Sequence, residues 1–149
     1  MAGSLVVRRG DGTPFKASGR ETDGRFDLFD MEVPFASGPP LHTHAEQEDS
    51  FYVVDGVLTV QLGDEVMELL AGDFASAAPG IPHTFTNARP ETPARMVNLM
   101  TPGIGFDRYI RQLGGPAAGP EVIEQLNRDF GVTMVGPPLS VRLGLSQQP

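Results

Sequence analysis

Short runs of apolar and β-branched residues, separated by turn residues, dominate the chain from Arg25 to about Met100. The first, Arg25–Val33, has apolar residues at both odd and even positions, which is typical of a strand covered on both faces. The runs that follow predict seven more short strands. They are Leu41–His44, Ser50–Val54, Val57–Leu62, Val66–Leu70, Phe74–Ala78, His83–Thr86 and Ala94–Met100.

The breaks between these runs indicate how the strands pair. Asp55-Gly56 and Gly63-Asp64 lie between β-branched runs and are strong hairpin signals. Closely spaced strands joined by such turns predict an antiparallel barrel or sandwich.

The two ends of the chain have other patterns. Residues 1 to about 24 predict an edge strand at Leu5–Val7 followed by a loop. After residue 103 the apolar spacing becomes helical and predicts two short helices, one from Phe106 to Leu113 and one from Pro120 to Phe130. They are expected to pack on the barrel wall, with a dimer contact or a mobile cover over the barrel mouth as the alternatives. The tail after Pro138 is expected to be poorly ordered.

Composition narrows the function classes. The net charge is −8 and there is no run of Lys or Arg, which argues against binding to nucleic acid or to anionic lipid and favours a small-molecule partner. Cysteine is absent, which excludes disulfides and thiolate chemistry. The start of the chain lacks the pattern of a signal peptide, and no apolar run approaches the roughly 20 residues of a membrane span, so a cytoplasmic protein is expected.

The three histidines carry most of the chemical argument. His42 and His44 are two residues apart in one predicted strand, so their side chains leave the same face. Asp49 starts the next strand, and His83 starts another about 40 residues later. The four side chains can converge inside a closed barrel as a site for Mn, Fe, Co, Ni, Cu or Zn. The alternative for a lone His-x-His pair is two surface or hydrogen-bonded histidines.

Two segments resemble the conserved motifs of the cupin superfamily. Residues 42–56 resemble the first motif, in which His-x-His is followed by a carboxylate and a glycine, here Gly56. Residues 72–87 resemble the second through Gly72, Pro79-Gly80, His83 and Asn87. The wider likeness is to bacterial single-domain proteins similar to quercetin dioxygenase. The resemblance implies an all-β jelly-roll barrel with two short C-terminal helices. It also implies one domain over residues 1–149, with the core barrel at about 25–101 and the helical extension at about 104–132.

The sequence departs from the family pattern at its carboxylate. Counting back from Gly56 places Asp49 where the family has a Glu, and Asp is shorter by one C–C bond, about 1.5 Å. Glu48 is the alternative ligand, but the alternation of its strand points it outward. Phe51, Val53 and Phe85 share the side of the ligands and are expected either to line a pocket or to pack in the core. Asn87 either donates to a ligand or caps a turn.

The resemblance implies a metal-dependent dioxygenase that acts on a small enol or phenol. His42, His44, Asp49 and His83 would hold one divalent transition metal, and Asp49 would also act as general base. The alternatives are a metal-dependent isomerase or cyclase that uses Lewis-acid chemistry and a non-catalytic small-molecule-binding barrel. Dioxygen is a possible second substrate, and a homodimer is expected from the resemblance and from the apolar strand at Phe26–Val33.

Overall fold

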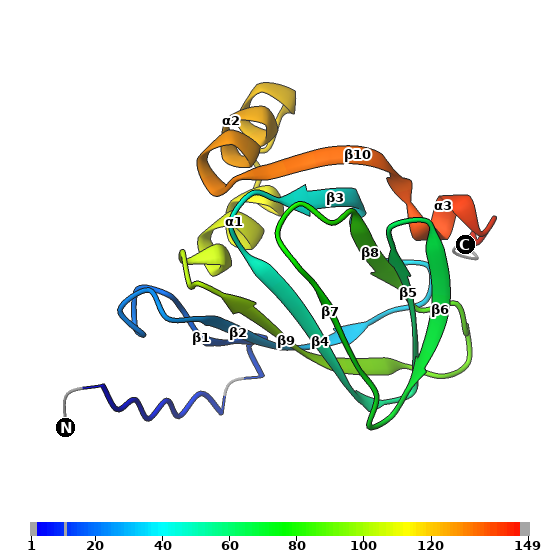
Figure 1. The fold of residues 1–149 in the computed structure, drawn as a ribbon, viewed down its shortest axis with the longest axis horizontal. Helices are drawn as coiled ribbons and strands as arrows, with labels where there is room; N and C mark the ends of the chain where they lie inside the picture. Colours follow the sequence, from blue (N-terminus) through cyan, green and yellow to red (C-terminus); the bar gives the residue numbers. More distant parts are fainter. Residues whose placement is uncertain (1–2, 11, 147–149) are drawn as a thin grey trace.

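The computed structural model describes residues 3–10 and 12–146 and is an antiparallel jelly-roll barrel with three short helices (Figure 1). The N-terminal strands are β1 (Phe15–Ala17), β2 (Asp27–Val33), β3 (Pro40–His44), β4 (Glu48–Asp55) and β5 (Val57–Leu62). The next four are β6 (Glu65–Leu70), β7 (Phe74–Ala77), β8 (His83–Thr86) and β9 (Ala94–Thr101). The C-terminal elements are α1 (Phe106–Leu113), α2 (Pro120–Phe130), β10 (Val132–Pro138) and α3 (Leu139–Arg142).

The strands form two five-stranded sheets. One has the order β1-β2-β9-β4-β7 and the other β10-β3-β8-β5-β6. All pairings between these strands are antiparallel. The eight strands predicted between Arg25 and Met100 are all present, with ends that shift by at most two residues. The expected jelly-roll fold with short C-terminal helices is therefore confirmed.

The hairpin predicted at Gly63-Asp64 joins the paired strands β5 and β6, but the one predicted at Asp55-Gly56 is wrong, because that turn carries the chain from β4 in one sheet to β5 in the other. Gly56 has φ 73°, and a Cβ at this position would lie 2.2 Å from the carbonyl oxygen of Pro93. Only glycine satisfies both the left-handed conformation and this close approach. The glycine that ends the first motif is therefore required by the backbone.

Three predictions for the flanks of the barrel are wrong. Leu5–Val7 forms no strand, and the first strand is Phe15–Ala17. The tail after Pro138 begins with the ordered helix α3, and its Leu139 is completely buried. β2 is fully buried on one face only, since Phe29 is buried and Glu32 is exposed. The terminal residues 1–2 and 147–149 of the expected single domain, and Asp11 of the expected loop, lie outside the described residues.

Two apolar clusters fill the molecule. The first lies between the sheets and contains Phe51, Val53, Leu58, Val60, Met96 and their neighbours. The second joins the barrel to α1 and α2 through Phe29, Met100, Phe106, Tyr109, Leu126, Phe130 and Val132. In Figure 1 both helices lie at one end of the barrel, beside β3 and β10. The helices pack on the barrel as expected. Among the described residues, no helix has the length and apolar content needed to cross a bilayer.

Candidate metal centre

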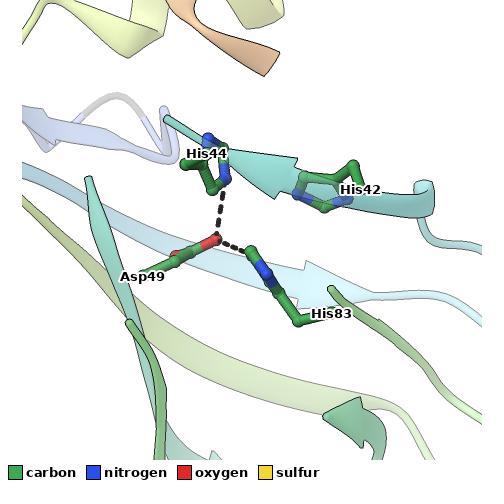
Figure 2. A group of neighbouring side chains, drawn as sticks. All are labelled: His42, His44, Asp49 and His83. Atoms are coloured by element: carbon green, nitrogen blue, oxygen red, sulfur yellow. Dashed lines mark hydrogen bonds and ion pairs between the residues drawn. The ribbon is translucent and has the colours of Figure 1, made fainter. Parts of the chain in front are cut away.

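The predicted site residues converge between the two sheets. His42 and His44 lie on β3, and His83 at the start of β8 is the direct cross-strand partner of His42. Asp49 comes from β4 in the other sheet. Strand alternation turns His42 and His44 inward together, whereas Thr43 between them is only half-buried. Figure 2 shows three imidazole rings and one carboxylate pointing toward one another.

The four groups are close and shielded from solvent. Each residue offers one ligand atom, and these atoms all lie within 4.8 Å of one another. The exposed fractions are 7% for His42, 2% for His44, 4% for Asp49 and 1% for His83. Three imidazoles and a carboxylate are the donor set that divalent transition metals prefer, so these residues are placed to hold a metal ion.

Backbone carbonyls fix the orientation of two of the rings. The Nδ1–H of His42 donates to Pro40 O, and the Nδ1–H of His83 donates to Ile81 O, each over 2.8 Å. A carbonyl accepts only, so Nδ1 must carry the proton in both rings. This hydrogen bond is the usual outer support of a metal-binding histidine, and it directs Nε2 inward. The Nε2 of His83 carries a second proton while it is hydrogen-bonded to Asp49, and binding a metal ion there would release that proton.

His44 provides the clearest sign that the site needs a further partner. Neither of its ring nitrogens has a hydrogen-bond partner within the described part of the chain, although the residue is buried. Nε2 lies 3.3 Å from Asp49 Oδ2 but lacks hydrogen-bond geometry. Buried polar atoms without partners are rare in folded proteins. A metal ion bound to Nε2 would satisfy one of these nitrogens.

Asp49 is the electrostatic centre of the group. Its Oδ2 accepts a hydrogen bond from His83 Nε2 at 2.9 Å, and its Oδ1 accepts one from Asn98 Nδ2 at 2.5 Å. Burial alone would raise the pKa of this carboxyl. The contacts with His44 and His83 outweigh burial and hold the pKa of Asp49 well below its usual range. The carboxylate is therefore ionised and able to bind a cation.

The histidines respond differently to this charge. Burial, assisted by the nearby His83, lowers the pKa of His42 to about 4. Burial also acts to lower the pKa of His83, but the hydrogen bond and the negative charge of Asp49 prevail and raise it. His42 is therefore neutral at pH 7, and the site favours positive charge next to Asp49.

The structure places Glu48 outside this group. It is exposed, and it accepts a hydrogen bond from Ser76 Oγ at 2.8 Å. Asp49, and not Glu48, is therefore the carboxylate that faces the histidines, as strand alternation predicted.

The remaining predicted residues belong to the surroundings of the site. Phe51 and Val53 are completely buried in the first apolar cluster, and Phe85 packs against it. The Phe51 ring centroid lies 6.1 Å from that of His83, so Phe51 closes the inner side of the site. Asn87 donates to the carbonyls of Val33 and Thr92 and holds a loop, as the turn interpretation predicted.

Two residues at the site were not found from the sequence. Asn98 binds Asp49, and Phe106 of α1 lies over His44 with 5.4 Å between ring centroids. A signal for Asn98 was available, because it interrupts the buried apolar positions Ala94, Met96 and Met100 of β9. Phe106 had no such signal, since its contact depends on how α1 packs against the barrel.

Comparison with known proteins agrees with this geometry. The family model described as Cupin domain matches residues 29–100, which include both motifs and all four site residues. The matched segment is a cupin domain. The chain resembles the quercetin 2,3-dioxygenase of Bacillus subtilis (strain 168), with 28% identity over 103 residues, which is 69% of the chain. The match spans only 30% of that dioxygenase.

Solved structures share the fold. A conserved protein with a double-stranded β-helix domain from Klebsiella pneumoniae is 28% identical, with a TM-score of 0.52 over 66% of this chain and 85% of that one. A predicted oxalate decarboxylase from Thermotoga maritima is 18% identical, with a TM-score of 0.58 over 64% of this chain and 97% of that one. At 18% identity the second likeness shows the fold alone.

Proposed function

We propose that this protein is a metal-dependent dioxygenase that acts on a small enol or phenol. His42, His44, Asp49 and His83 would hold one divalent transition metal, Mn, Fe, Co, Ni, Cu or Zn. The observation that carries the proposal is the buried set of three imidazoles and one ionised carboxylate within 4.8 Å. The resemblance to a protein named quercetin 2,3-dioxygenase supports the reaction class.

Each part of the site has a role in this reaction. A bound metal would lower the pKa of a substrate hydroxyl and bring dioxygen alongside the substrate. Asp49 Oδ2, which faces the imidazoles, would be held weakly by the metal, leave it in part to accept the hydroxyl proton, and so act as general base. The three imidazoles hold their positions on β3 and β8 while the proton moves.

The aromatic rings around the site favour a flat, apolar substrate. Phe51 lies beside His83 on the inner side, and Phe106 lies over His44 on the side of the helices. Both rings are almost fully buried and keep water from the site. Exclusion of water strengthens the electrostatic interactions of Asp49 and the imidazoles.

Elemental analysis of the purified protein, wild type beside His83→Ala, tests the metal site first. We expect about one transition metal per chain in the wild type and its loss in the variant, with circular dichroism to verify that the variant folds. Absence of metal in the wild type, even after reconstitution, would contradict the proposal.

Oxygen uptake with flavonols and diketones then tests the reaction. Asp49→Asn should abolish uptake, whereas the matched exposed variant Glu48→Gln should retain it. Substrate conversion without oxygen consumption would instead support an isomerase or cyclase. Binding of these compounds with recovery of unchanged material would support a non-catalytic binding protein.

The homodimer expected from the sequence stays a prediction. Exposed apolar side chains lie on the outer face of the sheet that contains β4, where Tyr52 and Phe74 are direct cross-strand partners and are 46% and 62% exposed. Sedimentation of wild type beside a Phe74→Ser variant would show whether two copies associate through this face.

A further inference from the structure

We propose that Asn98 is a positioning residue that restricts Asp49 to binding the metal through a single oxygen, Oδ2. This inference rests on the proposed metal site. It assigns a role to a residue outside the four ligands.

The geometry of Asn98 supports this role. It lies on β9, opposite Phe51 of the adjacent strand β4, and its side chain is buried on the inner side of the sheet. Its Nδ2 donates to Asp49 Oδ1 at 2.5 Å and to Ser50 O at 3.0 Å. Both amide hydrogens therefore have acceptors, and the second bond fixes the amide to the backbone of the strand that carries Asp49.

Asn98 forms a hydrogen bond with one oxygen of the carboxylate, Oδ1, and leaves Oδ2 facing the histidines. An aspartate has two side-chain torsions, and rotation of its carboxylate exchanges the two oxygens. The amide of Asn98 stops this rotation by holding Oδ1. Oδ2 then remains within 3.3 Å of His44 Nε2 and 2.9 Å of His83 Nε2.

A second buried carboxylate shows the contrasting, purely structural arrangement. Asp27 is completely buried, and both of its oxygens accept hydrogen bonds from groups outside the site. Oδ1 accepts from the amides of Gly19 and Gly105, and Oδ2 from the amide of Ile104 and the side chain of Gln47. Asp49 differs because only its Oδ1 has such a partner, while Oδ2 faces ligand-type nitrogens alone.

A neutral amide suits this position on electrostatic grounds. Lys or Arg would bring a positive charge that competes with a metal cation for Asp49, whereas the amide donates without a net charge. Supporting partners of metal ligands typically contribute about 10- to 100-fold to metal affinity.

Cobalt(II) binding to the full-length protein provides the test, with Asn98→Leu and Asn98→Ser as variants. We expect the dissociation constant for Co(II) to rise about 10- to 100-fold in both. The visible absorption bands of bound Co(II) should also change, because they report the geometry of the ligands. Asn98→Ser keeps the test available if the larger apolar side chain prevents folding.

The matched control is Asn87→Ser. Asn87 is also buried, and its Nδ2 also donates to two acceptors, but it lies outside the metal centre. This variant should lower the melting temperature of the metal-free protein and leave the affinity and the spectrum of Co(II) unchanged. If Asn98 had a purely structural role, its variants would behave like Asn87→Ser: the melting temperature would fall, and the affinity and spectrum of Co(II) would stay unchanged.

The outcomes separate this proposal from the one on which it rests. Wild-type affinity and an unchanged spectrum in folded Asn98 variants would overturn the role of Asn98 alone, as would an equal loss of affinity in Asn87→Ser. Absence of Co(II) binding by the wild type would overturn the metal site itself.

Discussion

His42 and His83 face each other across the β3–β8 pair, with ring centroids 4.5 Å apart, and each donates its Nδ1–H to the carbonyl two residues before it. The same local geometry on two neighbouring strands directs both Nε2 atoms inward. The rings differ in one contact, because only the Nε2 of His83 also donates to Asp49.

This difference predicts unequal costs for replacing the two residues in the metal-free protein. His83→Ala removes a charge-assisted hydrogen bond to a buried carboxylate and should lower the free energy of unfolding by about 2 kcal/mol. His42→Ala removes a bond between neutral groups and should cost about 1 kcal/mol. Urea denaturation in the presence of a chelator measures both. Equal losses would show that the bond between His83 and Asp49 contributes nothing to stability.

Asp27 is expected to be the most important buried polar group outside the site. It accepts hydrogen bonds from Gly19, Ile104 and Gly105, and so joins the start of α1 to the barrel. Asp27→Ala leaves these buried amides without a partner and should lower the free energy of unfolding by about 3 kcal/mol or more. Asp30→Ala is the control, since it breaks only the surface ion pair with Arg95 and should cost less than about 1 kcal/mol. A similar urea midpoint for the two variants would contradict this role of Asp27.

Most of the barrel could be predicted because its signals are local. Turn residues such as Asp55-Gly56 mark where strands end, and alternation within β3 places His42 and His44 on one face. The same alternation in β4 places Asp49 on the inner face and Glu48 on the outer face. Such features depend only on neighbouring residues and the geometry of a strand.

The features that were missed depend on partners far away in the sequence. β10 contains Gly136 and two prolines and lacks a clear strand pattern, and it is ordered because Val132 pairs with His44 of β3. Leu5–Val7 has a strand-like composition, but it pairs with no strand in the described part of the chain. A strand requires a neighbour that can accept its hydrogen bonds, and the sequence of one segment does not reveal whether that neighbour exists.

Phe106 is expected to control how quickly a metal ion leaves the site. Its ring covers His44 and stacks on Tyr109 with 4.6 Å between centroids. Phe106→Ala would open the side of the site that faces the helices, so a chelator should remove a bound metal faster than from the wild type. The lost burial should also lower the free energy of unfolding by about 3 to 4 kcal/mol.

The control for this experiment is Tyr109→Phe. It keeps the stacked ring and removes only the hydrogen bond from the Tyr109 hydroxyl to Asn127 Oδ1. The rate of metal extraction should then remain that of the wild type. An unchanged rate in Phe106→Ala would show that the metal leaves by another route.

Asp107 is expected to make the protein sensitive to acid through the first turn of α1. Burial acts to raise the pKa of this carboxyl, but the hydrogen bond from Ser18 and the charge and hydrogen bond of Arg20 outweigh it and lower the pKa. A carboxyl with a lower pKa in the folded state stabilises the fold above its unfolded pKa, about 4, and loses this contribution as pH falls through the folded value.

Urea denaturation between pH 6 and pH 3 tests this prediction with Asp107→Asn and Ser18→Ala. Asp107→Asn should be less stable than the wild type at pH 6, and the two should converge as pH falls, because the wild type loses the contribution that the variant already lacks. Ser18→Ala should lie between them, since Arg20 remains 3.0 Å from Asp107. A constant difference between Asp107→Asn and the wild type across this range would mean that the Asp107 carboxyl has the same pKa in the folded and unfolded states.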